Sequence, residues 1–161
     1  MANHHYSIEY VACVMNVAAR ECLSLVGLPV EHVLFAASEA AGGGIVRVDG
    51  RDLLKLGSGG DGDNAYRVDC ETGEVLYVGT DNPSTFLVNS SPQNLCECLN
   101  VFELEIARSS GEDDPAMLEE LAKLLGRSLE EIDSSALQGD RGFWRSILFD
   151  VAIGDYVDHE Q

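Results

Sequence analysis

Residues 53–91 read LLKLGSGGDGDNAYRVDCETGEVLYVGTDNPSTFLVNSS. The segment predicts three short strands, separated by a loop rich in glycine and aspartate and by a tight turn at Thr72-Gly73, with a helix cap at its end. The sequence contains no catalytic or metal-binding motif, so this segment is the part that narrows the function.

The strand pattern continues upstream of this segment. Asp49-Gly50 lies between two alternating apolar runs, which is a strong hairpin signal. Cys70-Glu71-Thr72-Gly73 marks the turn of a second hairpin. The expected strands are 45–48, 52–56, 65–69, 74–78 and 85–88, preceded by a first strand at 32–36.

Helical spacing of apolar residues predicts helices on either side of the strands. The expected first helix covers 11–26 and buries Val11, Val14, Met15, Ala18, Cys22, Leu25 and Val26. After the strands, Ser91-Pro92 begins one helix and Asp114-Pro115 begins another, which runs through Leu125. Ser128 and Glu131 form a capping box for a short turn, and residues 141–153 form the last helix.

The order of elements is one helix, five or six strands, and then three or four helices. Runs of strands followed by helices indicate an α+β fold with a mostly antiparallel sheet, and they argue against a parallel dinucleotide-binding sheet. A length of 161 residues fits a single domain over 1–161.

The composition indicates a cytoplasmic protein. No apolar run approaches the roughly 20 residues that span a membrane, and the first residues lack the cationic and apolar regions of a secretory signal. The cysteines number five and contain no Cys-x-x-Cys pair, so free thiols in a reducing compartment fit best.

The net charge of −18 is the strongest anomaly in the composition. Residues 1–102 contribute −8 and residues 103–161 contribute −10, so the acidity is densest in the last third. Such a surface repels nucleic acid and anionic lipid and attracts a cationic partner. Solubility alone explains the same charge equally well, and both interpretations stay open.

The polar loop Gly57–Asp63 invites two ligand interpretations, and both fail. A phosphate loop needs a lysine and a following helix, whereas here two aspartates and a strand are expected. A calcium loop needs ligands at alternate positions, but Ala65 and Tyr66 stand where the third ligand and the glycine should be.

The other candidates for chemistry are equally weak. The four histidines, His4, His5, His32 and His159, have no zinc-type spacing with the cysteines. Carboxylates are plentiful but diffuse, so a hydrolase assembled from scattered carboxylates is only a third hypothesis. We therefore expect no enzyme activity, no cofactor and no metal.

At residues 53–91 the order of features resembles the SUKH superfamily and, within it, the fourth group of bacterial immunity proteins. The resemblance rests on Leu56-Gly57 at a strand end, on Asp69-x-x-x-Gly73-x-Val75, and on Val88-Asn89-Ser90-Ser91 before an apolar helix. Leu25-Val26-Gly27-Leu28-Pro29 and Phe143-Trp144 match the end elements of that group.

The resemblance implies a strongly curved central sheet and a non-enzymatic cytosolic protein that binds and neutralises a polymorphic toxin. Many such toxins are nucleases or nucleic-acid deaminases, whose basic clefts would attract an acidic chain. The runner-up is a cytosolic adaptor or regulator of the same fold. In either case the partner is a protein, not nucleic acid or a membrane.

The resemblance supplies no catalytic residues. Gly57, Asp69, Gly73, Asn89 and Ser90 match its pattern, and we interpret them as fold-forming. The acids expected to bind the partner stand near turns of the sheet, where the role of a solvated turn former is the more common one for any single acid. They are Asp61, Asp63, Glu71 and Asp81.

Overall fold

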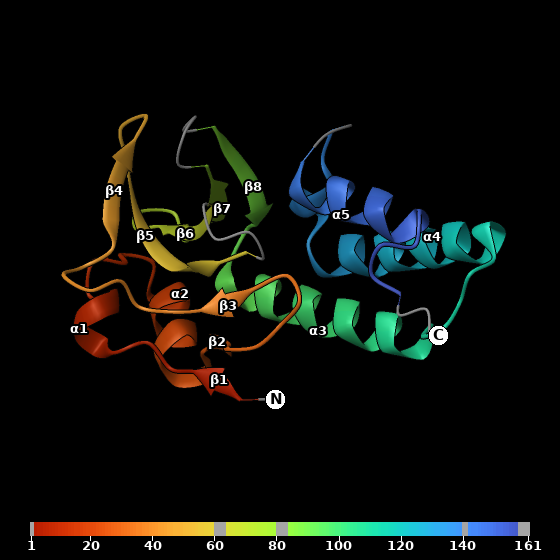
Figure 1. The fold of residues 1–161 in the computed structure, drawn as a ribbon. Coiled ribbons are helices and arrows are strands. Elements are labelled where there is room, and N and C mark those ends of the chain that lie inside the picture. The colour runs from red at the N-terminus through yellow and green to blue at the C-terminus, as the bar shows by residue number, and fades with distance from the viewer. Residues whose placement is uncertain (1, 60–63, 80–83, 140–141, 158–161) are drawn as a thin grey trace. The chain divides into compact units, whose positions relative to one another are not determined.

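The computed structural model describes residues 2–59, 64–79, 84–139 and 142–157 (Figure 1). The chain forms two compact units, Met1–Cys96 and Glu97–Gln161. The first contains the sheet, and the second contains most of the helical residues. A single domain over residues 1–161 stays a prediction.

A six-stranded antiparallel sheet forms the first unit (Figure 1). Its strand order is β3-β5-β6-β7-β8, and β4 also pairs with β5. A small second sheet pairs β1 with β2. The α+β class is confirmed. The bounds are β1 Asn3–His4, β2 Leu28–Pro29, β3 Ala36–Ala37, β4 Ile45–Val48, β5 Arg51–Ser58, β6 Ala65–Asp69, β7 Val75–Val78 and β8 Thr85–Asn89.

The predicted hairpin at Asp49-Gly50 joins β4 to β5. Both residues have positive φ, 52° and 78°, as the tight turns that suit twisted strands require. The pairing register shifts between Lys55 and Gly57 on β5 and again between Val75 and Leu76 on β7. Such bulges bend a strand and increase its local twist.

Both faces of the central strands are buried. Leu53 and Leu54 are adjacent on β5, and neither side chain is accessible to solvent, although neighbouring residues of a strand point to opposite faces. Leu53 packs with Leu76 and Val78 in one cluster. The central strands of the sheet are therefore buried on both faces.

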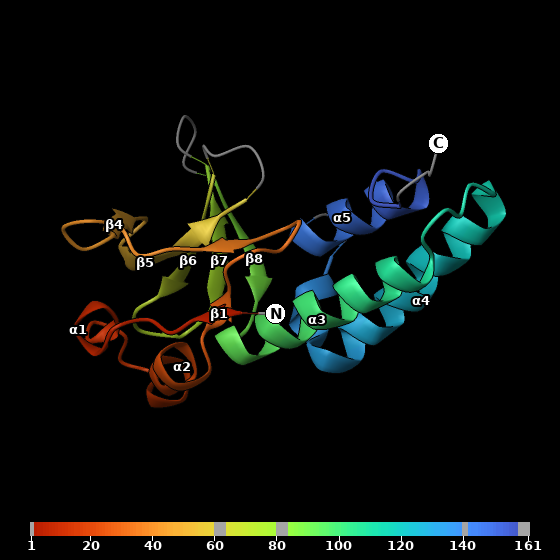
Figure 2. The same ribbon diagram turned by 60° about the horizontal axis from the view of Figure 1, so that its bottom comes forward.

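The predicted helix over 11–26 is wrong as a continuous element. The chain instead forms α1 at Ile8–Val11, α2 at Val17–Glu21 and a π-helical turn at Cys22–Val26. Asn16 interrupts it with extended backbone, φ −71° and ψ 112°, and its side chain accepts a hydrogen bond from Ala19 N at 2.9 Å. The expected stripe is therefore split, and Met15 and Leu25 are exposed. Figure 2 shows α1 and α2 next to each other on one side of the sheet.

The expected strand at 32–36 is shorter and later. The N–H groups of His32 and Phe35 each donate to the other residue's carbonyl at 3.1 Å, which closes a loop. Only Ala36 and Ala37 pair with β5, where they lie opposite Ser58 and Gly57.

The helices after the sheet begin where the caps predict. Ser91 Oγ accepts from Asn94 N at 3.1 Å, and Asp114 Oδ1 accepts from Ala116 N at 3.0 Å. The predicted end at Leu125 and the separate turn at Ser128 are wrong, since α4 continues and buries Leu129 on the same stripe. The bounds are α3 Pro92–Arg108, α4 Pro115–Ile132 and α5 Phe143–Ala152, with a 3₁₀ turn at Ser134–Leu137.

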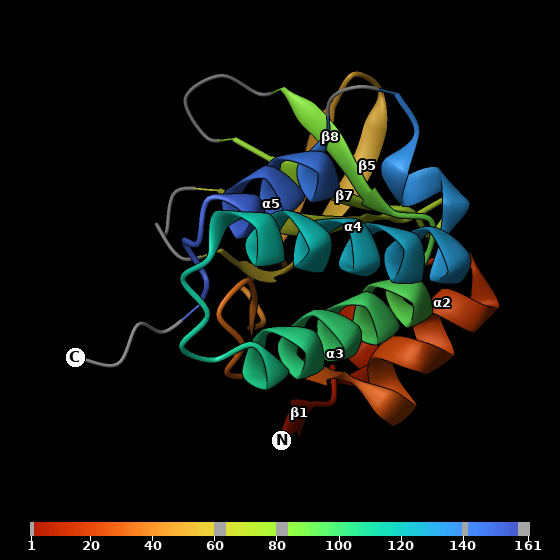
Figure 3. The ribbon, with the colours of Figure 1, turned by 90° about the vertical axis from the view of Figure 1, so that its right-hand side faces the viewer.

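In the second unit α4 and α5 lie side by side (Figure 3). Trp144 on α5 is fully buried, and its ring centroid lies 6.3 Å from that of Phe102. None of the helices in the described part of the chain is long and apolar enough to cross a membrane.

Candidate functional site

Helix α4 places an apolar strip outside the core of its unit. Its buried stripe consists of Leu118, Leu121, Leu125 and Leu129, at the spacing of one helical face. Met117 and Leu124 lie off this stripe, and their side chains are 52% and 48% exposed. Since they add little to the core, these two residues are available to a partner.

A groove of about 310 Å³ lies between the end of α3 and α4, next to these side chains. We call it the acidic groove, because three of its lining residues are glutamates and one is a cation, Arg127. The lining residues are Glu105, Ser109, Glu112, Met117, Glu120, Leu121, Leu124 and Arg127.

The three glutamates of the acidic groove are held by local contacts. Glu105 Oε1 accepts from Arg108 at 3.0 Å, and Glu120 Oε1 lies 3.4 Å from the Lys123 ammonium. Glu112 Oε1 accepts from the backbone N–H of Asp114 at 3.1 Å. In each case the contact engages Oε1, and a carboxylate has two oxygens with about four acceptor positions. The groove can therefore take further cationic donors.

The composition of the acidic groove suits binding more than catalysis. It combines exposed aliphatic side chains with carboxylates, which is the chemistry that receives a basic side chain with an apolar stem. Across the residues that the structure describes, no group of three His, Cys, Asp or Glu side chains could hold a metal ion.

Of the acids proposed from the sequence, Glu71 is the one that lies within the described residues, and it does not line this groove. Asp61, Asp63 and Asp81 lie outside the described residues, so their role stays a prediction. Glu71 is exposed in the turn between β6 and β7, and its backbone N–H donates to Asp69 Oδ1 at 2.8 Å. That turn is at the opposite end of the sheet from Ser58 and Val78, the strand ends that precede the other three acids.

Asp69 organises the turn that contains Glu71. Its carboxylate is 2% exposed, and Oδ1 accepts from the N–H groups of Glu71 and Thr72 while Oδ2 accepts from Arg51 Nε at 2.5 Å. Burial alone would raise the pKa of Asp69, but these hydrogen bonds and the Arg51 charge bring it below its usual value. Asp69 thus acts on the backbone of its own turn.

Gly73 completes the same turn with φ 82°. A Cβ on Gly73 would lie 3.2 Å from Ala19 Cβ and 3.2 Å from Asn16 Cγ, so the turn packs directly on the start of α2. The spacing Asp69-x-x-x-Gly73 therefore combines a carboxylate that binds the turn with a glycine that lets it approach a helix.

The other three fold-forming candidates, Gly57, Asn89 and Ser90, lie on β5 and at the end of β8. A Cβ on Gly57 would collide with the carbonyl of Ala36 on β3. Asn89 is fully buried at the end of β8, and Ser90 Oγ accepts from Asn94 Nδ2 at 3.0 Å, next to the start of α3.

The sequence analysis missed Glu105, Glu112 and Glu120 as a group. Two signals pointed toward them: the denser acidity of the last third and the position of Met117 and Leu124 off the buried stripe of α4. Neither signal shows which helical turns of α3 and α4 face each other. That pairing depends on the conformation of the loop between the two helices.

Comparison with known proteins supplies the family. No curated protein and no solved structure matches the chain. The model of one family, described as SUKH-4 immunity protein, matches residues 11–150, which include the sheet, the Asp69–Gly73 turn and nearly all of the helices. The chain therefore belongs to the SUKH-4 immunity protein family.

Proposed function

We propose that this protein neutralises a cognate toxin domain by binding it, without catalysing a reaction, and that the acidic groove is a main part of its binding surface. The observation that carries the proposal is the groove itself, in which exposed Met117 and Leu124 are flanked by Glu105, Glu112 and Glu120. Family membership supports the immunity role.

The charge of the chain supports a basic partner. Enzymes that act on nucleic acids have basic clefts, because their substrates are polyanions. A chain with a net charge of −18 attracts such a cleft over long range and gains association rate from it. Met117 and Leu124 then supply apolar contact once the two surfaces meet. We therefore propose a nuclease or nucleic-acid deaminase domain as the toxin and the cytoplasm as the place of action.

Occlusion of the cleft is the mechanism that fits these features. A bound acidic surface with protruding apolar side chains excludes the toxin's own substrate from a basic cleft. This mechanism requires stable association and no chemical change in the toxin.

Co-expression with candidate nuclease and deaminase toxin domains tests the proposal. We expect cells to survive, the two chains to co-purify, and association to slow as salt rises, because salt screens long-range attraction. Survival without co-purification would contradict occlusion. Co-purification with a non-toxic partner, and no survival, would instead support an adaptor.

Charge-neutral variants test the acidic groove. The triple variant Glu105→Gln, Glu112→Gln, Glu120→Gln should slow association more than a control that removes equal charge from the first unit. The control is Glu9→Gln, Glu21→Gln, Glu31→Gln, at three exposed positions. Equal slowing by both would show that net charge, and not the groove, directs binding.

A further inference from the structure

The positive side chains of the second unit are gathered on one groove between α4 and α5. The structure describes four Lys and Arg residues between 97 and 157, and three of them line this groove. They are Lys123, Arg127 and Arg145, and among the described residues Glu130 is the carboxylate that lines the groove with them. We call this the cationic groove. The chain has 28 acids and 10 bases, so a group of three cations is a local exception to its negative charge. Such a group attracts an anionic ligand.

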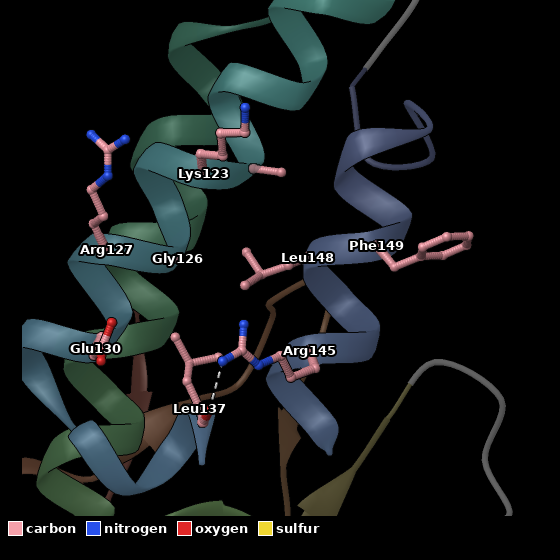
Figure 4. Close-up of a pocket in the computed structure, with 9 residues that line it drawn as sticks. Lys123, Gly126, Arg127, Glu130, Leu137, Arg145, Leu148 and Phe149 are labelled. Carbon is pink, nitrogen blue, oxygen red and sulfur yellow. Dashed lines mark hydrogen bonds between the residues drawn. The ribbon is translucent and has the colours of Figure 1, made fainter. Parts of the chain in front are cut away.

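The cationic groove has a volume of about 460 Å³. Its floor is apolar. A Cβ on Gly126 would lie 3.3 Å from Leu148 Cδ1, so the absence of a side chain brings α4 close to α5. Figure 4 shows Leu148 pointing from α5 toward α4, and Phe149 pointing away from α4. Phe149 is 66% exposed and extends the apolar surface beyond the floor.

The three cationic side chains differ in the contacts that they already make within the chain. Arg145 donates Nη2 to Leu137 O at 2.8 Å and Nε to Gly139 O at 3.2 Å, which positions its guanidinium and leaves three of its five N–H groups for a ligand. Lys123 makes one exposed ion pair with Glu120, which a ligand can replace. Among the described residues no carboxylate pairs with Arg127.

We propose that the cationic groove binds an acidic peptide segment of the protein partner, with an apolar side chain of that segment on Leu148 and Phe149. The proposal rests on the proposed function, since the segment belongs to the partner bound there. Arginine matches a carboxylate with two parallel hydrogen bonds, and the apolar floor requires an apolar side chain. A nucleic acid or an anionic membrane would bring many charges against a chain of net charge −18.

The two grooves share a lining residue, Arg127, and therefore border the same part of α4. A partner that binds both presents basic groups to Glu105, Glu112 and Glu120, and acidic groups to Lys123, Arg127 and Arg145. A partner placed the other way round meets like charges in both grooves. The pair of grooves thus selects one orientation and rejects partners with a uniform charge.

Two peptide probes test the cationic groove by NMR titration of the full chain. The acidic probe is acetyl-Glu-Leu-Glu-Phe-Glu-amide, and the basic probe has lysine in place of glutamate. We expect the acidic probe to shift the amide signals of Gly126, Leu148 and Phe149. We expect the basic probe to shift those of Met117 and Leu124.

Single substitutions locate the acidic probe. Lys123→Gln and Arg145→Gln should each weaken its binding about two- to five-fold, the usual effect of losing one exposed pair. The control Arg47→Gln removes one positive charge from β4 and should leave binding of the acidic probe unaltered. Arg47 is exposed, and among the described residues it pairs only with Asp52. The Lys123 side chain is exposed as well, so Lys123→Gln should leave the fold intact.

The outcomes separate the two proposals. No shift at α4 and α5 with the acidic probe, or equal weakening by Arg47→Gln, overturns the cationic groove as a peptide site. Stronger binding of a short oligothymidylate to the same residues overturns it in favour of nucleic acid. Failure of the basic probe alone counts against the acidic groove of the proposed function and leaves the cationic groove standing.

Discussion

Arg51 and Asp69 form an ion pair between β5 and β6, with Arg51 Nε 2.5 Å from Asp69 Oδ2. Arg51 also donates Nη2 to Glu74 at 2.9 Å, so one guanidinium connects the first residue of β5 to both ends of the β6–β7 turn. Asp69 binds that turn through two backbone N–H groups. The pair therefore holds the β6–β7 turn against the start of β5.

Loss of the Asp69 charge should destabilise the fold. We expect Asp69→Asn to lower the free energy of unfolding by about 1–3 kcal/mol, because a buried hydrogen-bonded ion pair is broken. Urea denaturation measures this. The control is Asp52→Asn, whose carboxylate is half-exposed and pairs with exposed Arg47; it should cost less than about 0.5 kcal/mol. Equal losses would contradict the role of Asp69.

Acid should remove the contribution of Asp69. Its pKa is lower in the folded chain than the usual value, so its stabilisation is complete above about pH 4 to 5 and is lost as pH falls through the folded pKa. The gap in unfolding free energy between the native chain and Asp69→Asn should therefore shrink from pH 6 to pH 3. A gap that stays constant over this range would contradict the lowered pKa.

A side chain at Gly73 should cost more than one at Gly50. Both glycines have φ near 80°, which costs a substituted residue about 1–2 kcal/mol. A Cβ at Gly50 meets nothing within 4 Å, whereas one at Gly73 crowds Ala19 and Asn16. Gly73→Ala should lose about 1 kcal/mol more than Gly50→Ala in urea denaturation. Equal losses would show that the backbone angle alone matters.

Two of the thiols should resist alkylation in the folded chain. Burial raises the pKa of Cys22 to about 11; burial and the hydrogen bond of its thiol to Cys13 Sγ, at 3.3 Å, raise the pKa of Cys70 to about 12. Because the thiolate is the reactive form, iodoacetamide at pH 8 should label the partly exposed Cys13 and Cys96 before the buried Cys22 and Cys70. Peptide mass spectrometry measures the order, and all five should react in urea. Early labelling of Cys70 would contradict this.

Leu124 and Leu125 are neighbours on α4 and should respond differently to truncation. Leu125 is fully buried, so Leu125→Ala should cost about 2–5 kcal/mol. Leu124→Ala should cost less than about 1 kcal/mol and should weaken binding of the toxin, because Leu124 lines the acidic groove. Thermal unfolding and a pull-down measure the two effects. A Leu124→Ala variant that binds normally would argue against the groove.

Local chemistry in the sequence was a good guide to strands, turns and helix starts. Asp49-Gly50 predicted a hairpin because both positions need positive φ, and Ser91 and Asp114 marked the helix starts because each can accept a free backbone N–H. The helix over 11–26 failed for a tertiary reason. Asn16 lies against the β6–β7 turn, where its side chain donates to Thr72 O. The apolar spacing within residues 11–26 carries no information about a contact with that distant turn.

By itself, the sequence determined the α+β class, the family resemblance and the acidic character of the chain, since these depend on periodicity, short motifs and composition. The tertiary structure alone decided which charges act together. Glu71 and Asp69 are two residues apart, yet one is exposed and the other is buried against Arg51. Glu105 and Glu120 come from different helices but line one groove. A charge acts through its distance to other charges and its exposure to water, and both depend on the folded backbone.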